Sequence, residues 1–151
     1  MRFTITPFVA LTALLAAACG GDSSGPGSNN AVPLTGSWSY STSNLSAIGV
    51  TCNSSGTILT VTQVGSTFSG TYSGGTLSCT SSSGTVSGAV GSGVVVSGSL
   101  VGNAVSFDLD TSDWRNTGSV TGNSMSGTVT VRVVVSGTLY TLTGAFGAAR
   151  L

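Results

Sequence analysis

Three aspartates lie close together in the run Phe107-Asp108-Leu109-Asp110-Thr111-Ser112-Asp113-Trp114. On a strand, Asp108 and Asp110 would share one face with their carboxylates ~6–7 Å apart, a spacing that resembles a glycosidase pair. Together with Asn116, the three aspartates also offer oxygen ligands for Ca²⁺. The run lacks the spacing and the glycine of an EF-hand, and aspartate is common in turns. We therefore expect no metal and keep the three aspartates as weak candidates for Ca²⁺.

The rest of the chain offers little for catalysis. Its 151 residues include no His, and the sequence also contains no Lys and no Glu. A histidine is the usual general base, and a lysine is needed for a Schiff base. The sequence therefore predicts a protein that is not an enzyme, with no catalytic residues and no cofactor.

Two of the three cysteines predict a disulfide. Cys52 and Cys79 remain after the removal of a leader, and the compartments that exported proteins reach are oxidising. A redox-active pair would need the Cys-x-x-Cys spacing, which these residues lack. We expect a structural Cys52–Cys79 bond that joins the segment before the second strand to the fourth strand.

A set of large side chains forms the candidate ligand site. Its members are apolar or amphipathic and recur along the chain: Trp38, Tyr40, Phe68, Tyr72, Phe107, Met125 and, more loosely, Tyr140. Inside a barrel such residues either line a cavity or simply fill the lumen. Both interpretations remain open from the sequence.

A five-residue unit positions most of these side chains: apolar, Ser or Thr, Gly, small, apolar. Copies lie at residues 34–38, 68–72, 86–90, 96–100 and 125–129, with looser copies at 135–139 and 142–146. Residues i, i+2 and i+4 of a strand share a face, so each unit places two apolar side chains on one face with a glycine between them. The glycines leave room inside a barrel, and they also permit tight coiling of its strands.

Strand-like runs separated by turn residues predict the fold. The ten runs are residues 34–42, 57–64, 67–73, 76–81, 84–90, 93–101, 104–110, 117–121, 124–135 and 138–147. Two-residue turns are expected at Gly65-Ser66, Gly102-Asn103, Gly122-Asn123 and Ser136-Gly137. Consecutive hairpins form a meander, and closure removes its free edges. We expect an all-β fold: a single antiparallel up-and-down barrel of about eight strands.

The N-terminus has the features of an export signal. Arg2 supplies positive charge, residues 3–15 are mostly apolar, and small residues lead to Cys19. The run Leu15-Ala16-Ala17-Ala18-Cys19 resembles the lipobox of bacterial lipoproteins, in which the cysteine carries a diacylglyceryl thioether. The alternative is an ordinary leader cleaved after Ala18 that leaves Cys19 as a free thiol.

The resemblance implies a three-part chain. Residues 1–18 would be the signal peptide, residues 19–33 a lipidated cysteine with a flexible Gly/Ser tether, and residues 34–151 the barrel domain. Gly20, rather than Asp, follows the cysteine, which in Gram-negative lipoproteins favours the outer membrane. We therefore expect an exported protein that is anchored to the outer membrane through Cys19.

The barrel has its own resemblance. Gly36-Ser37-Trp38 is similar to the Gly-x-Trp that opens the first strand of lipocalins and avidins, and Ser69-Gly70-Thr71-Tyr72 is similar to an avidin Thr-Gly-Thr-Tyr motif. Met125-Ser126-Gly127 matches part of a later avidin pattern. In lipocalins a late arginine packs on the opening tryptophan, a part that Arg132 or Arg150 could play. The resemblance implies a barrel that holds a small molecule.

Composition limits the partners. The formal net charge is zero and only 5% of the residues are charged, so no nucleic-acid partner is expected. Threonine rows such as residues 57–62 could form an outer binding surface, although threonine also simply suits exposed strands. We expect a barrel that binds a small apolar or amphipathic ligand. The alternative is a structural or protein-interaction module of the cell envelope with a filled barrel and an unknown protein partner.

Overall fold

The computed structural model describes residues 32–110, 113–135 and 138–151. These ranges hold ten strands and no helix: β1 (Gly36–Ala47), β2 (Val50–Val64), β3 (Thr67–Ser73), β4 (Thr76–Ser81), β5 (Gly84–Ala89), β6 (Ser92–Val101), β7 (Ala104–Leu109), β8 (Trp114–Thr121), β9 (Ser124–Val135) and β10 (Thr138–Arg150). Within them, no helix is long and apolar enough to cross a membrane. The leader and Cys19 lie outside the described residues and stay predictions.

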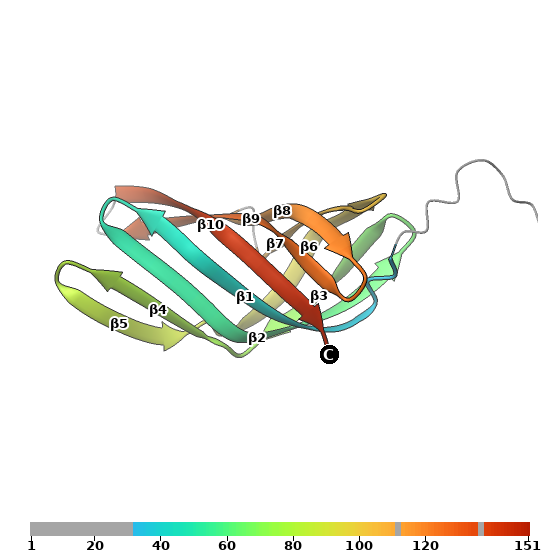
Figure 1. Ribbon diagram of the computed structural model, residues 1–151, viewed down its shortest axis with the longest axis horizontal. Helices are drawn as coiled ribbons and strands as arrows, with labels where there is room; N and C mark the ends of the chain where they lie inside the picture. Colours follow the sequence, from blue (N-terminus) through green and yellow to red (C-terminus); the bar gives the residue numbers. More distant parts are fainter. Residues whose placement is uncertain (1–31, 111–112, 136–137) are drawn as a thin grey trace, which may run out of the picture.

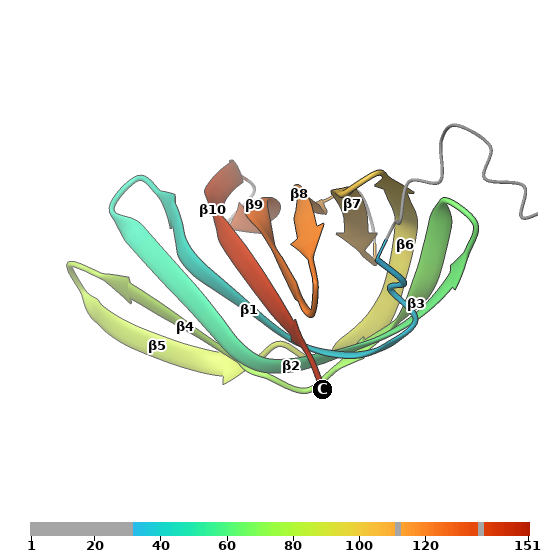
Figure 2. The same ribbon diagram turned by 45° about the vertical axis from the view of Figure 1, so that its right-hand side comes forward.

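Eight of the strands close into a barrel, which confirms the predicted fold class. Neighbouring strands follow the order β1-β10-β9-β8-β7-β6-β3-β2, and β2 pairs again with β1. Every pair is antiparallel. The β4–β5 hairpin lies outside this ring and flares away from β8, β9 and β10 (Figures 1 and 2). Among the described strands, this hairpin pairs only with β2, at residues 51–55.

Glycine turns join the strands at one end of the barrel. The predicted turns begin at Gly65, Gly102 and Gly122, with φ of 61°, 59° and 56°. A positive φ at the first position of a two-residue turn is the geometry that glycine adopts most readily. The fourth predicted turn, at residues 136–137, lies outside the described residues.

The connection predicted between residues 42 and 57 is instead part of two long strands, so this expectation was wrong. Its many Ser, Asn and Gly residues favour a loop, but pairing with β10 and β4 holds them in strands. Each strand contains an irregularity: Asn44 has φ of 54° in β1, and Gly56 has φ of 75° in β2. At each irregularity one extra residue is inserted, so the buried positions are three residues apart instead of two. Thr42 and Leu45 are both buried in β1, and Ser54 and Thr57 are both buried in β2.

The two ends of the barrel differ. At the end with the glycine turns, the side chain of Leu34 is 1% exposed, and its carbonyl accepts a hydrogen bond from Trp38 Nε1 at 2.8 Å. The guanidinium of Arg150 lies 4.5 Å above the Trp38 ring and donates to the carbonyls of Thr35 and Pro33. Arg150, one of the two arginines suggested by the lipocalin resemblance, therefore closes this end.

Candidate functional site: an apolar cavity beside the disulfide

The side chains predicted to bind a ligand all lie in the buried interior. Trp38, Tyr40, Phe68, Tyr72, Phe107 and Met125 are each at most 8% exposed. Phe107 is central to an aromatic cluster, with ring centroids 5.7 Å from Phe146, 5.9 Å from Phe68 and 6.4 Å from Tyr40. Aromatic side chains therefore fill much of the lumen.

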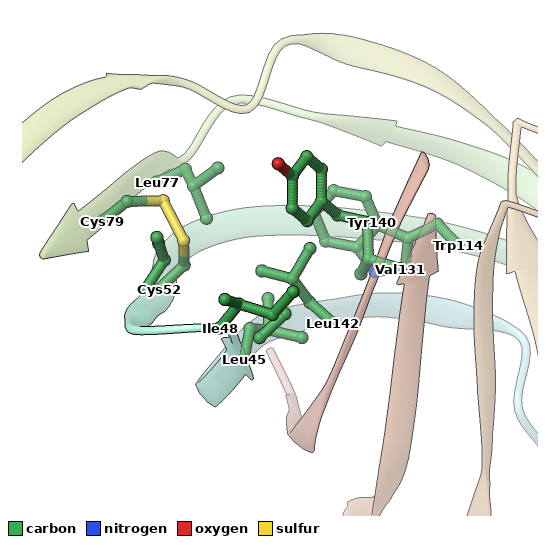
Figure 3. Close-up of a pocket in the computed structure, with 11 residues that line it drawn as sticks. Leu45, Ile48, Cys52, Leu77, Cys79, Trp114, Val131, Tyr140 and Leu142 are labelled. Atoms are coloured by element: carbon green, nitrogen blue, oxygen red, sulfur yellow. A yellow bond between two sulfur atoms is a disulfide. The ribbon is translucent and has the colours of Figure 1, made fainter. Parts of the chain in front are cut away.

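A cavity of about 420 Å³ lies at the opposite end from Arg150. It is lined from the barrel strands and from the flaring hairpin by Leu45, Ala47, Ile48, Val50, Cys52, Leu77, Cys79, Trp114, Val131, Tyr140 and Leu142. Figure 3 shows the disulfide and Leu77 on one side, with Tyr140, Val131 and Trp114 on the other. This volume is within the range of small-molecule sites, which are mostly apolar. Of the side chains predicted to form the ligand site, Tyr140 is the one that lines this cavity.

The predicted disulfide is confirmed and forms part of the cavity wall. Cys52 and Cys79 are bonded and stand directly opposite each other in the β2–β4 ladder. Cys52 lies inside β2 rather than before it. We call residues 45–55 and 76–89 the lobe, because these parts of β1, β2, β4 and β5 extend beyond the bulges at Asn44 and Gly56. The disulfide links the two segments of the lobe.

Buried polar groups separate the cavity from the aromatic cluster. Tyr40 Oη donates to Asn116 Oδ1 at 2.8 Å and accepts a hydrogen bond from Trp114 Nε1 at 3.1 Å. Asn116 Nδ2 in turn donates to the carbonyl of Phe107 at 3.4 Å. Burial raises the pKa of the Tyr40 phenol, so this hydroxyl keeps its proton. The network holds the Trp114 indole, whose ring lines the cavity.

A second polar pair lies at the level of the bulges. Thr42 Oγ1 and Ser54 Oγ are 2.8 Å apart, and the Thr42 amide also donates to Ser54 Oγ at 3.1 Å. Both side chains are buried and satisfied, which removes the cost of burying an unpaired hydroxyl. The bulges are therefore fixed by specific hydrogen bonds at the base of the lobe.

Asp108 and Asp110 have partners within the protein. Asp108 is buried and its Oδ1 lies 3.3 Å from Arg115 Nε. Asp110 accepts hydrogen bonds from Tyr72 Oη and from the Val94 amide, the latter at 2.9 Å. Among the described residues, no group of three or more His, Cys, Asp or Glu side chains could hold a metal ion. Asp108 therefore contacts β8 through Arg115, and Asp110 contacts β6 through the Val94 amide.

Ile48 is an unusual residue at the tip of the lobe. It turns the chain from β1 into β2 with φ of 38°, followed by Gly49 with φ of 76°. A β-branched residue is rare at positive φ, and the conformation costs roughly 1–2 kcal/mol. Its side chain is 87% exposed and lines the cavity. An asparagine or glycine would suit this turn better. The strained position is therefore occupied by an apolar side chain that lines the mouth of the cavity.

The sequence did not predict a cavity at this end, because its lining residues Leu45, Ala47, Ile48 and Val50 lie in the segment 43–56, which was not predicted as strand. The available signal was alternation at Leu45, Ala47, Val50 and Cys52, which a Ser-rich context obscured. No family model, no curated protein and no solved structure matches this chain.

Proposed function

We propose that the protein is an exported lipoprotein whose barrel binds a small apolar or amphipathic ligand in the cavity beside Cys52–Cys79. The observation that best supports this proposal is a cavity of about 420 Å³ whose lining is almost wholly hydrocarbon and sulfur. Burying apolar ligand surface there is favourable by ~25 cal/mol per Å² removed from water. The anchor at Cys19 rests on the lipobox resemblance alone.

A binding assay can use the uncharged fluorophore N-phenyl-1-naphthylamine with residues 20–151. We expect saturable binding by the wild-type protein and none by Ala47→Phe, which places a ring in the cavity. Ala104→Phe is the matched control, because Ala104 is exposed at the start of β7 and is not among the cavity-lining residues. Equal binding by all three proteins would place the fluorophore elsewhere and count against the proposal.

Trp114 provides a second readout. Its ring lines the cavity, whereas Trp38 is 0% exposed at the other end. Ligand addition should change the tryptophan emission of the wild-type protein and leave the emission of Trp114→Phe unchanged. Native mass spectrometry of the same protein would identify a ligand acquired during expression.

The alternative is a structural or protein-interaction module, and the filled aromatic interior favours it. Under this alternative the cavity is only a gap between the lobe and the barrel. Failure of the fluorophore, and of a lipid and metabolite extract, to bind the wild-type protein would support it.

The proposed anchor has an independent test. Replacement of Cys19 by serine should move the full-length protein from the membrane fraction to the soluble fraction of the cell envelope. Wild-type protein that is already in the soluble fraction, with no change on replacement, would argue for an ordinary leader without lipidation.

A further inference from the structure

The polar groups of the cavity lining are very few. Nine of the eleven lining side chains carry only carbon, hydrogen and sulfur, and the two exceptions are Trp114 and Tyr140. Trp114 Nε1 is already engaged, because it donates to Tyr40 Oη at 3.1 Å. The Tyr140 hydroxyl has no hydrogen-bond partner among the residues that the structure describes. One side-chain group is therefore free to recognise a polar atom of a ligand.

The backbone adds little to this recognition. The lining strands are paired with neighbours along the cavity: β1 with β2, β2 with β4, and β10 with β9. Their amide and carbonyl groups are largely used in these ladders. A ligand with several polar groups would have to leave some of them without partners, which is costly for those that are buried against the apolar lining.

Charge is also missing from the lining. Asp108 lies against Arg115, Asp110 binds Tyr72 and Val94, and Arg150 closes the other end of the barrel. None of the charged side chains in the described ranges lines the cavity. An ionic group would lose hydration there without gaining a counter-charge.

Tyr140 offers a ligand both an apolar ring, which lines the cavity, and one polar hydroxyl. In Figure 3 the ring lies between Leu77 on one side and Val131 and Trp114 on the other, with the hydroxyl toward the Leu77 side. Tyr140 is half-buried. From these contacts we infer that the ligand is uncharged and amphipathic, with an apolar body in the cavity and a single polar group hydrogen-bonded to Tyr140 Oη. This inference rests on the proposed function of the cavity.

The test compares decanol, decane and decanoate as competitors of N-phenyl-1-naphthylamine at pH 8, where decanoate is ionised. We expect decanol to bind the wild-type protein more tightly than decanoate. Tyr140→Phe should weaken decanol about three- to tenfold, the effect of losing one neutral hydrogen bond, and leave decane unchanged. Tyr72→Phe is the matched control, because it removes a hydroxyl that bonds to Asp110 outside the cavity lining.

The possible results distinguish a failure of this inference from a failure of the proposed ligand binding in the cavity. Wild-type-like decanol binding by Tyr140→Phe, or tightest binding of decanoate, would overturn the inference while the cavity remains a binding site. Absence of binding by the fluorophore and all three competitors to the wild-type protein would remove both.

Discussion

The same five-residue unit builds two regions that differ in packing. In the barrel, a Cβ atom added at Gly70 would lie 1.9 Å from the carbonyl oxygen of Thr60, and one at Gly127 would lie 2.2 Å from that of Thr117. In the lobe, a Cβ atom at Gly88 would meet nothing within 4 Å. The unit therefore brings strands into close contact in the barrel, whereas in β5 it produces a strand that is exposed throughout.

The supply of aromatic residues explains this difference. The barrel strands provide the rings of Tyr40, Phe68, Phe107 and Phe146, which pack against one another. Residues 76–89 of the lobe contain no aromatic residue, and Leu77 and Cys79 are only half-buried. Composition thus makes a tightly packed body and a thin wall, and the cavity lies between them.

The largest expected effect comes from the centre of the barrel. Phe107→Ala removes the ring that contacts three other aromatic residues and should lower the free energy of unfolding by about 3–5 kcal/mol. Leu77→Ala, in the half-buried lobe, should cost much less. Urea denaturation of both variants measures the difference, and equal losses would contradict a division into packed body and thin wall.

The disulfide should matter most within the lobe. It closes 27 residues, and its removal can cost at most about 3–4 kcal/mol on the chain-entropy account. In the double variant Cys52→Ser, Cys79→Ser we expect faster amide hydrogen exchange in β4 and β5. Exchange in β8 and β9 provides the internal control. Uniform acceleration across all strands would show that the lobe unfolds together with the barrel.

The sequence was informative where a strand obeys the period-two pattern and a glycine turn follows it. Residues 67–73, 76–81 and 124–135 were assigned to strands with the bounds that the structure has, and the Cys52–Cys79 bond was predicted. Residues 45–55 of the lobe were missed because the pattern is broken at Asn44 and Gly56, where an extra residue shifts the alternation. Whether an aromatic side chain fills the lumen or lines a cavity depends on long-range packing, which the two-residue alternation of apolar side chains does not specify.

The glycines of the unit allow a matched comparison. Gly127→Ala places a methyl group against the backbone of β8 and should cost about 1–3 kcal/mol or more, as overpacking does. Gly88→Ala meets open space at a strand position and should be neutral or slightly stabilising, by up to about 1 kcal/mol. Thermal denaturation measures the stability change of each variant relative to the wild type. Similar destabilisation of both variants would mean that β5 is packed in solution.

The tip of the lobe should show a trade between stability and binding. Ile48→Asn relieves a β-branched residue at φ of 38° and should raise the free energy of unfolding by about 1 kcal/mol. It also removes an apolar group from the cavity mouth, so fluorophore binding should weaken. Val64→Asn is the control, because Val64 is 74% exposed beside a turn at the closed end. A destabilised Ile48→Asn variant would contradict the strain at this turn.

The last expected effect depends on pH and concerns Tyr72, whose hydroxyl donates a hydrogen bond to Asp110. Burial, followed by the hydrogen bond to the Asp110 carboxylate and its negative charge, raises the pKa of Tyr72 to about 12 from 10.0. The folded protein therefore holds this proton more tightly than the unfolded chain. The resulting stabilisation is complete below pH ~10 and is lost as the pH rises toward ~12.

Tyr72→Phe has no phenol proton at this position and should lose less stability than the wild type over that interval. The buried Tyr40, whose pKa is also raised, is present in both proteins, so the difference isolates Tyr72. Urea denaturation at several pH values from about 9 to about 12, the range around the phenol pKa, gives the slope of the unfolding free energy against pH for both proteins. Coincident slopes would mean that the Tyr72–Asp110 contact does not couple the phenol proton to folding.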